Sequence, residues 1–367
     1  MKRNRKGHQF YAMRQKRLCC KVLRRRKKRK RRHSYVPFSQ INQPLSEKAY
    51  NEILIRAFPG YKHVKAPKNF SFIQNRDEVL SFLQQLDDCR NRRKKVLVRL
   101  DKVENLPTDA ILLLLSTMIH FQVDKVEFNG TNPKDVNINL KLIDSGFFER
   151  LYKKSSKAKE EYSFRKINSY IYTHGQKTVS STLADNLVKY ASESVWGEPR
   201  RCQGIQKTLL ELMHNTYDHA GMSKGDKHWW LSVEHDQVNK EVIFSFIDFG
   251  VGIFRSLRNK GPQEPLYGVW QKIIEKYPLA TSQVEKLKLI LEGQIQLSQT
   301  NDYYRGKGLA KIYNHYTNNK IASLCMASNY AFINADKNEY VQLNNEFMGT
   351  FISFKIKENI VSLPWQI

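Results

Sequence analysis

Four short motifs, in a fixed order between residues 203 and 354, constrain this chain more than any other feature of its sequence. The first is the stretch QGIQKTLLELMHNTYDHAG, which begins at Gln203 and has apolar residues at helical spacing. Glu211, Asn215 and Asp218 occupy positions i, i+4 and i+7, so a helix would carry all three on one face. Carboxylate and amide oxygens are hard ligands of the kind that Mg²⁺ prefers. The stretch therefore predicts a helix with a polar face that suits magnesium, although by itself the same spacing is also typical of a solvated helix face.

The second motif follows a predicted strand. Residues 241–247 alternate as a strand does and end in the sequence DFGVGI, so Asp248 closes the strand and Gly250 and Gly252 follow it. A carboxylate at a strand end can accept a hydrogen bond from an exocyclic amine, and the glycines let a ligand approach the backbone closely. By itself, the same pattern is also typical of an ordinary turn.

The third and fourth motifs come near the end of the chain. The sequence YRGKGL at residues 304–309 stands directly before a predicted helix at 310–316. Glycines in this position expose the first amide groups of the helix to phosphate, and Lys307 adds a positive charge. The fourth motif, MGT at 348–350, precedes an alternating stretch and predicts the start of a strand.

In this order, the four motifs resemble the N box and the three G boxes of the GHKL family. That family includes the ATP-binding domains of gyrase, the heat-shock chaperone, histidine kinases and mismatch-repair ATPases. The resemblance covers about half of the chain, residues 180–357. It implies an α/β fold, a two-layer sandwich with a mixed sheet of the Bergerat kind, that binds ATP and Mg²⁺. It also implies a lid, at residues 254–305, that closes over the nucleotide.

The resemblance further implies a role for each matching residue. Asn215 would coordinate magnesium, Asp248 would hold the adenine amino group, and Glu211 would be the general base of a hydrolytic member. Asp218 and His219 would border the phosphates. The remaining nucleotide-binding positions would be the glycines, the end of the lid and a threonine near the adenine: Gly250, Gly252, Arg305, Gly306, Lys307, Gly308, Leu309 and Thr350.

A second region of alternating strands and helices lies ahead of the ATP-binding domain. Residues 95–100 and 123–128 have the pattern of strands, and a helix that starts at Pro107 separates them. A further helix is predicted at 139–152. This spacing predicts a parallel sheet in a small α/β domain at 77–160.

The start of the Pro107 helix carries another resemblance. Leu100-Asp101 at a strand end and Thr108-Asp109 at the helix start resemble a STAS domain, a family that often has a phosphorylated serine at this helix start. Thr and Asp are also what an ordinary helix N-terminus prefers, so both explanations stay open.

Charge is concentrated at the N-terminus. The chain has a net charge of +27, and residues 1–33 hold 17 Lys and Arg but no Asp or Glu. Such a run is typical of disorder and attracts phosphate backbones by counterion release, which makes nucleic acid a candidate partner. No groove-reading pattern accompanies it, so a solubilising extension is the alternative.

Other classes of protein are disfavoured. The five cysteines form no CxxC pair, which argues against a disulfide framework or a zinc site. The longest apolar run, 110–115, is far too short for a membrane span, so we expect a cytoplasmic protein without membrane contact. The expected organisation is a basic tail at 1–33, a linker and helical lead-in at 34–76, the small α/β domain at 77–160, the ATP-binding domain at 161–357 and a C-terminal tail at 358–367.

Three functions compete for this sequence. The first is an ATP-hydrolysing conformational switch that acts on a protein partner, and Glu211 favours it. The second is a protein kinase of the anti-sigma or histidine-kinase kind, which the STAS resemblance and the pair Asp218-His219 favour. The third is a nucleic-acid-associated module with regulatory ATP, which residues 1–33 favour. We choose the first, and a homodimer is compatible with it because many members of the family dimerise.

Overall fold

The structure of this chain is a computed structural model that describes residues 46–152, 169–175, 179–219, 228–248, 250–258, 268–295 and 308–364. At 169–175, 217–219, 228 and 269 it describes the backbone alone. The basic tail at 1–33 and the expected nucleotide-binding residues Arg305, Gly306 and Lys307 lie outside the described residues. Residues 1–59 and 60–367 form two separate units. In the first, helix α2 (Glu47–Ala57) begins where the Ser46 side chain accepts a hydrogen bond from the Ala49 amide, as the lead-in predicted.

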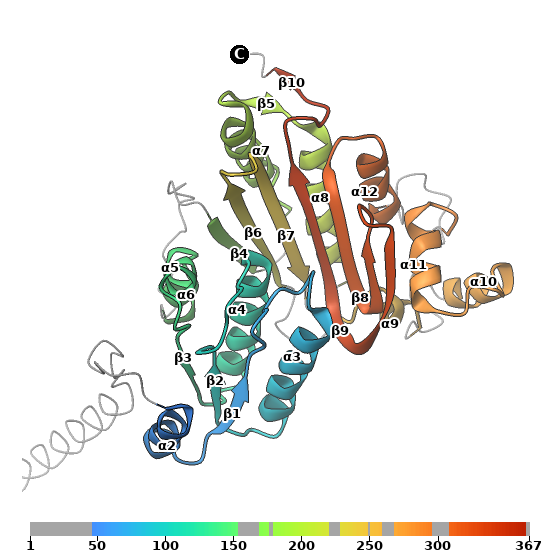
Figure 1. Ribbon diagram of the computed structural model, residues 1–367. Coiled ribbons are helices and arrows are strands. Elements are labelled where there is room, and N and C mark those ends of the chain that lie inside the picture. Colours follow the sequence, from blue (N-terminus) through green and yellow to red (C-terminus); the bar gives the residue numbers. More distant parts are fainter. Residues whose placement is uncertain are drawn as a thin grey trace, which may run out of the picture. The chain divides into compact units, whose positions relative to one another are not determined.

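The second unit begins with a three-stranded sheet, which is parallel throughout and has the order β1-β2-β3. Helices connect its strands in the expected alternation, which confirms a parallel sheet in this region (Figure 1). The elements are β1 (Lys62–Lys65), α3 (Arg76–Asn91), β2 (Val96–Arg99), α4 (Thr108–Val123), β3 (Phe128–Thr131), α5 (Val136–Asp144) and α6 (Phe147–Tyr152).

Three boundaries in this region differ from the expectation. The strand expected at 123–128 was wrong, because α4 continues to Val123 and β3 begins only at Phe128. Lys125, with a φ of 56°, reverses the chain between them. The helix expected at 139–152 is two helices, which Gly146 separates with a φ of 79°. Strand β1 lies in the segment expected to be a linker.

A five-stranded sheet forms the centre of the unit, with the order β4-β6-β7-β9-β8. Every described pairing in it is antiparallel, so the expected mixed sheet was wrong. Short turns join β6 to β7 and β8 to β9, and such turns allow only antiparallel neighbours. The strands are β4 (Ser169–Gly175), β6 (His228–Asp236), β7 (Glu241–Asp248), β8 (Ala322–Asn334) and β9 (Glu339–Ile356). The MGT motif lies inside β9 and does not begin it.

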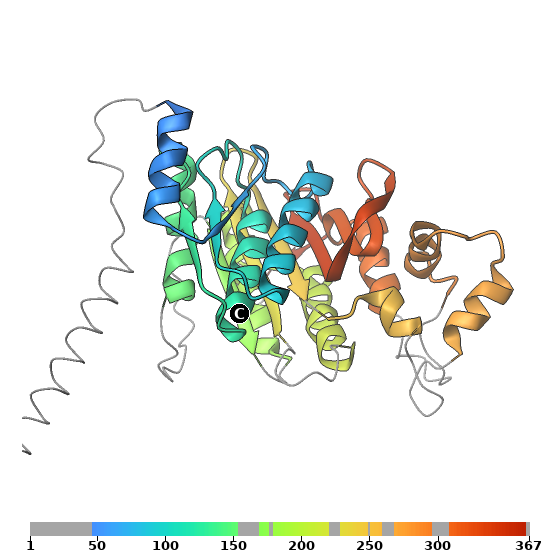
Figure 2. The ribbon, with the colours of Figure 1, turned by 90° about the horizontal axis from the view of Figure 1, so that it is seen from below.

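Helices cover both faces of this sheet, so three layers replace the expected two (Figures 1 and 2). In β6, β7, β8 and β9, alternate residues face opposite cores, and the set beneath α7 and α8 consists mainly of large apolar side chains. The set facing α3 and α4 also includes the buried serines Ser232, Ser245 and Ser353. In β9, Ile352 belongs to the core beneath α7 and α8, whereas Phe351 belongs to the core beneath α3 and α4. The helices on the first face are α7 (Ser181–Trp196), α8 (Gln203–His219), α11 (Gln283–Leu291) and α12 (Gly308–Thr317).

The remaining elements are short. Strands β5 (Arg200–Arg201) and β10 (Leu363–Pro364) pair with each other, and α9 (Ile253–Arg258) and α10 (Val269–Lys276) lie between β7 and α11 in the chain. None of the helices in the described ranges is long and apolar enough to cross a membrane.

An aromatic cluster joins the parallel-sheet region to the five-stranded sheet. The ring of Phe72, fully buried, lies 4.9 Å from that of Phe351 and 5.2 Å from that of Phe347, measured between centroids. Next to it, the Arg76 guanidinium lies 4.5 Å above the Phe332 ring and pairs with Glu339. The two regions therefore share one core. The domain boundary expected near residue 160 falls at 153–168, outside the described residues.

The shared core predicts that Phe72→Ala lowers the free energy of unfolding by about 3–5 kcal/mol, because it leaves a cavity between the two regions. Both regions should lose stability in a single transition in urea, followed by tryptophan fluorescence and circular dichroism. Leu279→Ala, at a side chain that is 90% exposed, is the control and should change stability by less than about 0.5 kcal/mol. Two separate transitions, of which Phe72→Ala shifts only one, would contradict a common core.

Candidate functional site

Helices α8 and α12 lie side by side in antiparallel directions, and three contacts define their register. Thr208 Oγ1 lies 3.0 Å from His315 Nδ1, at the start of α8 and the end of α12. One turn further along α8, Lys311 Nζ donates a hydrogen bond of 2.6 Å to Glu211 Oε1. The first residue of α12 then reaches Asn215. Glu211 and Asn215, two residues of the polar face predicted for α8, therefore face α12.

Gly308, the first residue of α12, lies close to two polar side chains of α8. A Cβ atom at this position would lie 3.0 Å from Glu211 Oε2 and 3.1 Å from Asn215 Oδ1. Any larger residue would push these side chains away, so the glycine keeps the N-terminus of α12 against both of them. The first and third sequence motifs thus meet in space at Glu211, Asn215 and Gly308.

Three other residues were expected to bind the nucleotide close to Gly308. Leu309 is buried beside Gly308, in the first turn of α12, where it anchors the helix in the core. Asp218 and His219 end α8, and their side chains lie outside the described residues.

Lys311 belongs to this cluster, although the sequence analysis did not single it out. Its ammonium group and the Glu211 carboxylate form an ion pair that is partly open to solvent, with side chains 38% and 25% exposed. Lys311 follows Gly308 by three residues, so a helix presents both on one side. That spacing was the signal available in the sequence. Together, a carboxylate, an amide, an ammonium group and a helix N-terminus converge here.

Asp248 lies at the end of β7, directly opposite Thr350 of β9. The second and fourth motifs are therefore neighbours in the sheet. Burial raises the pKa of the Asp248 carboxyl to about 6, while hydrogen bonds from the Gly250 amide and from the side chain and backbone of Thr350 act in the opposite direction. The Gly250 amide donates to Asp248 Oδ1 over 2.9 Å. A half-buried acceptor is thus held in place at the strand end.

At the second glycine of the DFGVGI motif, the side chain of Asn329 leaves no room for a larger residue. Gly252 has a φ of 76°, and a Cβ atom there would lie 2.5 Å from Asn329 Oδ1. Asn329 is fully buried in β8, donates to the carbonyl of Val251 over 3.0 Å and accepts from the amide of Phe254 over 3.0 Å. It therefore clamps both sides of the glycine.

A serine supports the same turn. Ser328 Oγ accepts from the Ile253 amide over 3.0 Å and donates to the Gly349 carbonyl over 2.9 Å. It thereby ties the second motif to the fourth. Neither Ser328 nor Asn329 belongs to a recognisable sequence motif, so only the pairing of β8 with β9 reveals their role.

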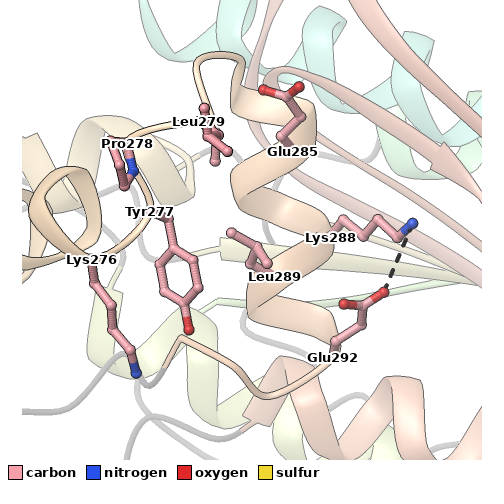
Figure 3. A pocket seen from close by; sticks show the side chains of 9 residues that line it. Lys276, Tyr277, Pro278, Leu279, Glu285, Lys288, Leu289 and Glu292 are labelled. Atoms are coloured by element: carbon pink, nitrogen blue, oxygen red, sulfur yellow. Dashed lines mark ion pairs between the residues drawn. The ribbon is translucent and has the colours of Figure 1, made fainter.

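Two cavities within the described part of the chain lie away from these residues. One of about 470 Å³ lies between α10 and α11, where Tyr277, Leu279 and Leu289 line it (Figure 3). Another of about 440 Å³ lies near Tyr316 and Asp336. Their linings carry no arrangement of groups like that around Glu211, so we place the candidate site by its chemistry.

Part of the expected lid is a fixed element. Leu287 and Ile290 of α11 are buried in the core that α8 and α12 share. Helix α11 is therefore packed as firmly as the elements around it. Between α9 and α10, residues 259–267 lie outside the described part of the chain.

Metal ligands and known relatives give no further identification. Within the described ranges, no group of three or more His, Cys, Asp and Glu side chains gathers in a way that could hold a metal by itself. Neither the protein-family models nor the curated proteins that were searched match the chain. What the site can do therefore follows from its own side chains.

The clamp around Gly252 predicts that Gly252→Ala destabilises the protein more than the same change at Gly197. Both glycines have a φ of 76°, but a Cβ atom at Gly197 would meet nothing within 4 Å. Gly197→Ala should therefore cost only the backbone strain, about 1–2 kcal/mol. Gly252→Ala should cost about 1–3 kcal/mol more, because Asn329 loses its buried hydrogen bonds. Equal losses in urea denaturation would show that Asn329 is not a rigid neighbour.

The buried carboxyl of Asp248 predicts a pH dependence of stability. Its folded pKa of about 6 lies above the ordinary value of about 3.9, so its ionisation costs stability as the pH rises from about 4 to about 6. Asp248→Asn should therefore gain stability relative to the parent chain over this interval and keep the gain at higher pH. Thermal unfolding without nucleotide, at several pH values, measures the difference. A difference that is independent of pH would contradict the raised pKa.

Proposed function

We propose that this chain binds Mg-ATP between α8, α12 and the end of β7, and that it acts as an ATP-hydrolysing switch on a protein partner. One observation carries the proposal: the N-terminus of α12, at Gly308, lies against the side chains of Glu211 and Asn215. An anion-binding helix end, a carboxylate and an amide oxygen are the three groups that a magnesium triphosphate needs around it.

The phosphate end of the proposed site is built on α8 and α12. The helix N-terminus carries about half a positive charge, and its first amide groups have no partner within the helix. Lys311, one turn later, would add its charge once it turns from Glu211 to the phosphate. Asn215 would offer its amide oxygen to magnesium. The bound magnesium would neutralise the negative charge of the phosphate oxygens. The close contact at Gly308 is a fitting cradle, because any side chain there would fill the space next to both polar groups.

The adenine end is proposed at the strand pair β7–β9. Asp248 is an acceptor for an exocyclic amine, and above a pH of about 6 it is ionised. Thr350 lies opposite and hydrogen-bonds to it, which fixes its orientation. The turn at Gly250 and Gly252 is held by Ser328 and Asn329, so the backbone next to the base would be rigid.

Glu211 is the proposed general base. Its present partner is Lys311, at 2.6 Å. An ammonium group of this kind can turn toward an anionic phosphate oxygen, because both members of the pair are partly exposed. Glu211 would then be free to take a proton from the attacking water.

The proposed output runs through the sheet. Thr350 is the partner of Asp248, and the next residue, Phe351, points to the opposite face, where it contacts the ring of Phe72. A change at the adenine end thereby reaches the parallel-sheet region through two adjacent residues of β9. That region, with its own exposed helices, is the part that we propose meets the protein partner.

The test is ATP binding and turnover on the full chain, by calorimetry and phosphate release with magnesium. Asp248→Asn should weaken binding by about ten-fold or more, because an amide nitrogen replaces an acceptor. Glu211→Gln should keep the affinity within about three-fold but lower turnover by about 10²–10⁴-fold. Glu275→Gln, at an exposed position of α10, is the matched control and should change neither quantity.

Three other results would sink the proposal in different ways. Equal binding by the parent chain and Asp248→Asn would show that the adenine end is misplaced. Binding without phosphate release, but with transfer of label to protein, would replace the switch by a kinase. No binding by well-folded parent protein would remove ATP from the function.

A further inference from the structure

The N-terminal edge of the parallel sheet is a basic surface, apart from the proposed nucleotide site. Because β1, β2 and β3 are parallel and Lys62, Val96 and Phe128 are aligned, the residues just ahead of all three strands meet at one edge. Neighbouring strands are about 4.8 Å apart, so this edge spans about 10 Å. We call it the basic edge. It consists of Lys62, Arg90, Arg92, Arg93, Lys94, Lys95 and Lys125.

Only some of these seven cations are neutralised. Arg90 forms ion pairs with Asp87 and Asp124, and Lys95 pairs with Glu127 at 2.8 Å. Arg93 reaches a backbone carbonyl over 3.4 Å. The other four, which are all exposed, form no ion pair within the described part of the chain: Lys62, Arg92, Lys94 and Lys125.

The number of basic residues at this edge is larger than the folded structure needs for its own stability. Helices α3 and α4 both end here, at Asn91 and Val123, and basic residues stabilise helix C-termini. Each helix end is equivalent to about half a negative charge, so the two together offset about one cation. Seven basic residues stand against four acidic ones (Asp87, Asp88, Asp124 and Glu127), which leaves an excess of three. Most of the excess therefore faces solvent.

The composition of the edge fits a phosphodiester chain better than a lipid surface. Interfacial binding to membranes depends on large apolar side chains that enter the bilayer. In the segments 60–65, 90–96 and 123–129, Val123 is the one large apolar side chain that is exposed. Exposed Arg and Lys without partners are what the phosphates of a nucleic acid attract, through release of counterions.

We infer that the basic edge is a nucleic-acid backbone-binding surface, in which Lys62, Arg92, Lys94 and Lys125 contact phosphates without reading sequence. This surface belongs to the folded unit and is separate from the 17 basic residues at 1–33. It is independent of the proposed ATP binding, since none of its residues lies in the nucleotide site.

The experiment compares the full chain with a variant in which these four residues are replaced by Gln. The probe is a short mixed-sequence DNA duplex, and affinity is measured by fluorescence anisotropy at several salt concentrations. The slope of log K against log salt should become shallower by about 3.6, because each of the four lost phosphate contacts contributes about 0.9. A control with four exposed lysines elsewhere changed to Gln should keep the slope within about 0.5 of the parent. These are Lys189, Lys272, Lys276 and Lys337.

Thermal unfolding and ATP affinity are measured on the same proteins, so that loss of folding or of the nucleotide site is recognised separately. Equal slopes for the edge variant and the control variant would overturn the inference, because binding would then be diffuse. If the edge variant had the same slope as the parent chain, all of the DNA binding would belong to other residues. Binding to vesicles of phosphatidylcholine and phosphatidylserine that needs the same four residues, without binding to DNA, would replace nucleic acid by a membrane surface.

Discussion

Burial of both faces of the five-stranded sheet is the constraint on which the rest of this structure depends. Apolar side chains of the strands lie on both faces of the sheet, so the helices α7 and α8 cover one face and α3 and α4 the other. The parallel-sheet region is therefore a structural layer of the unit, and the ring of Phe72 inserts among aromatic residues of β8 and β9. A rearrangement of the sheet would therefore change the packing of the helices on both of its faces.

The same constraint positions the candidate site. Because β7 and β9 pair in antiparallel register, Asp248 and Thr350 become neighbours although about a hundred residues separate them in the sequence. Because α8 and α12 pack on the same face of the sheet, Glu211 and Asn215 meet Gly308. Packing of apolar surfaces thus brings together polar residues that lie far apart in the sequence, at Asp248 and Thr350 and again at Asn215 and Gly308. In the proposed switch, the β9 strand joins this cluster to the far layer through Thr350 and Phe351.

None of the cations of the basic edge belongs to the proposed nucleotide site. At the candidate site, Lys311 is paired with Glu211. Part of the excess charge of the folded unit, three cations beyond the neighbouring acidic residues, lies at the basic edge, where three strands begin and two helices end. An ATP-dependent switch with a separate backbone-binding surface would unite two of the functions that compete for the sequence.

The sequence by itself determined the local elements and the residue types of the site. Helical spacing in α8, alternation in β7 and the glycines of the motifs depend on neighbours a few residues away, which is the range over which such patterns act. The fully antiparallel sheet, its third layer and the roles of Lys311, Ser328 and Asn329 were decided by tertiary structure. An isolated asparagine such as Asn329 carries no signal in a sequence. It acquires its role only when the fold places Asn329 next to Gly252, where a Cβ atom on the glycine would lie 2.5 Å from Asn329 Oδ1. That placement depends on strand pairing, which is set by burial over the whole unit.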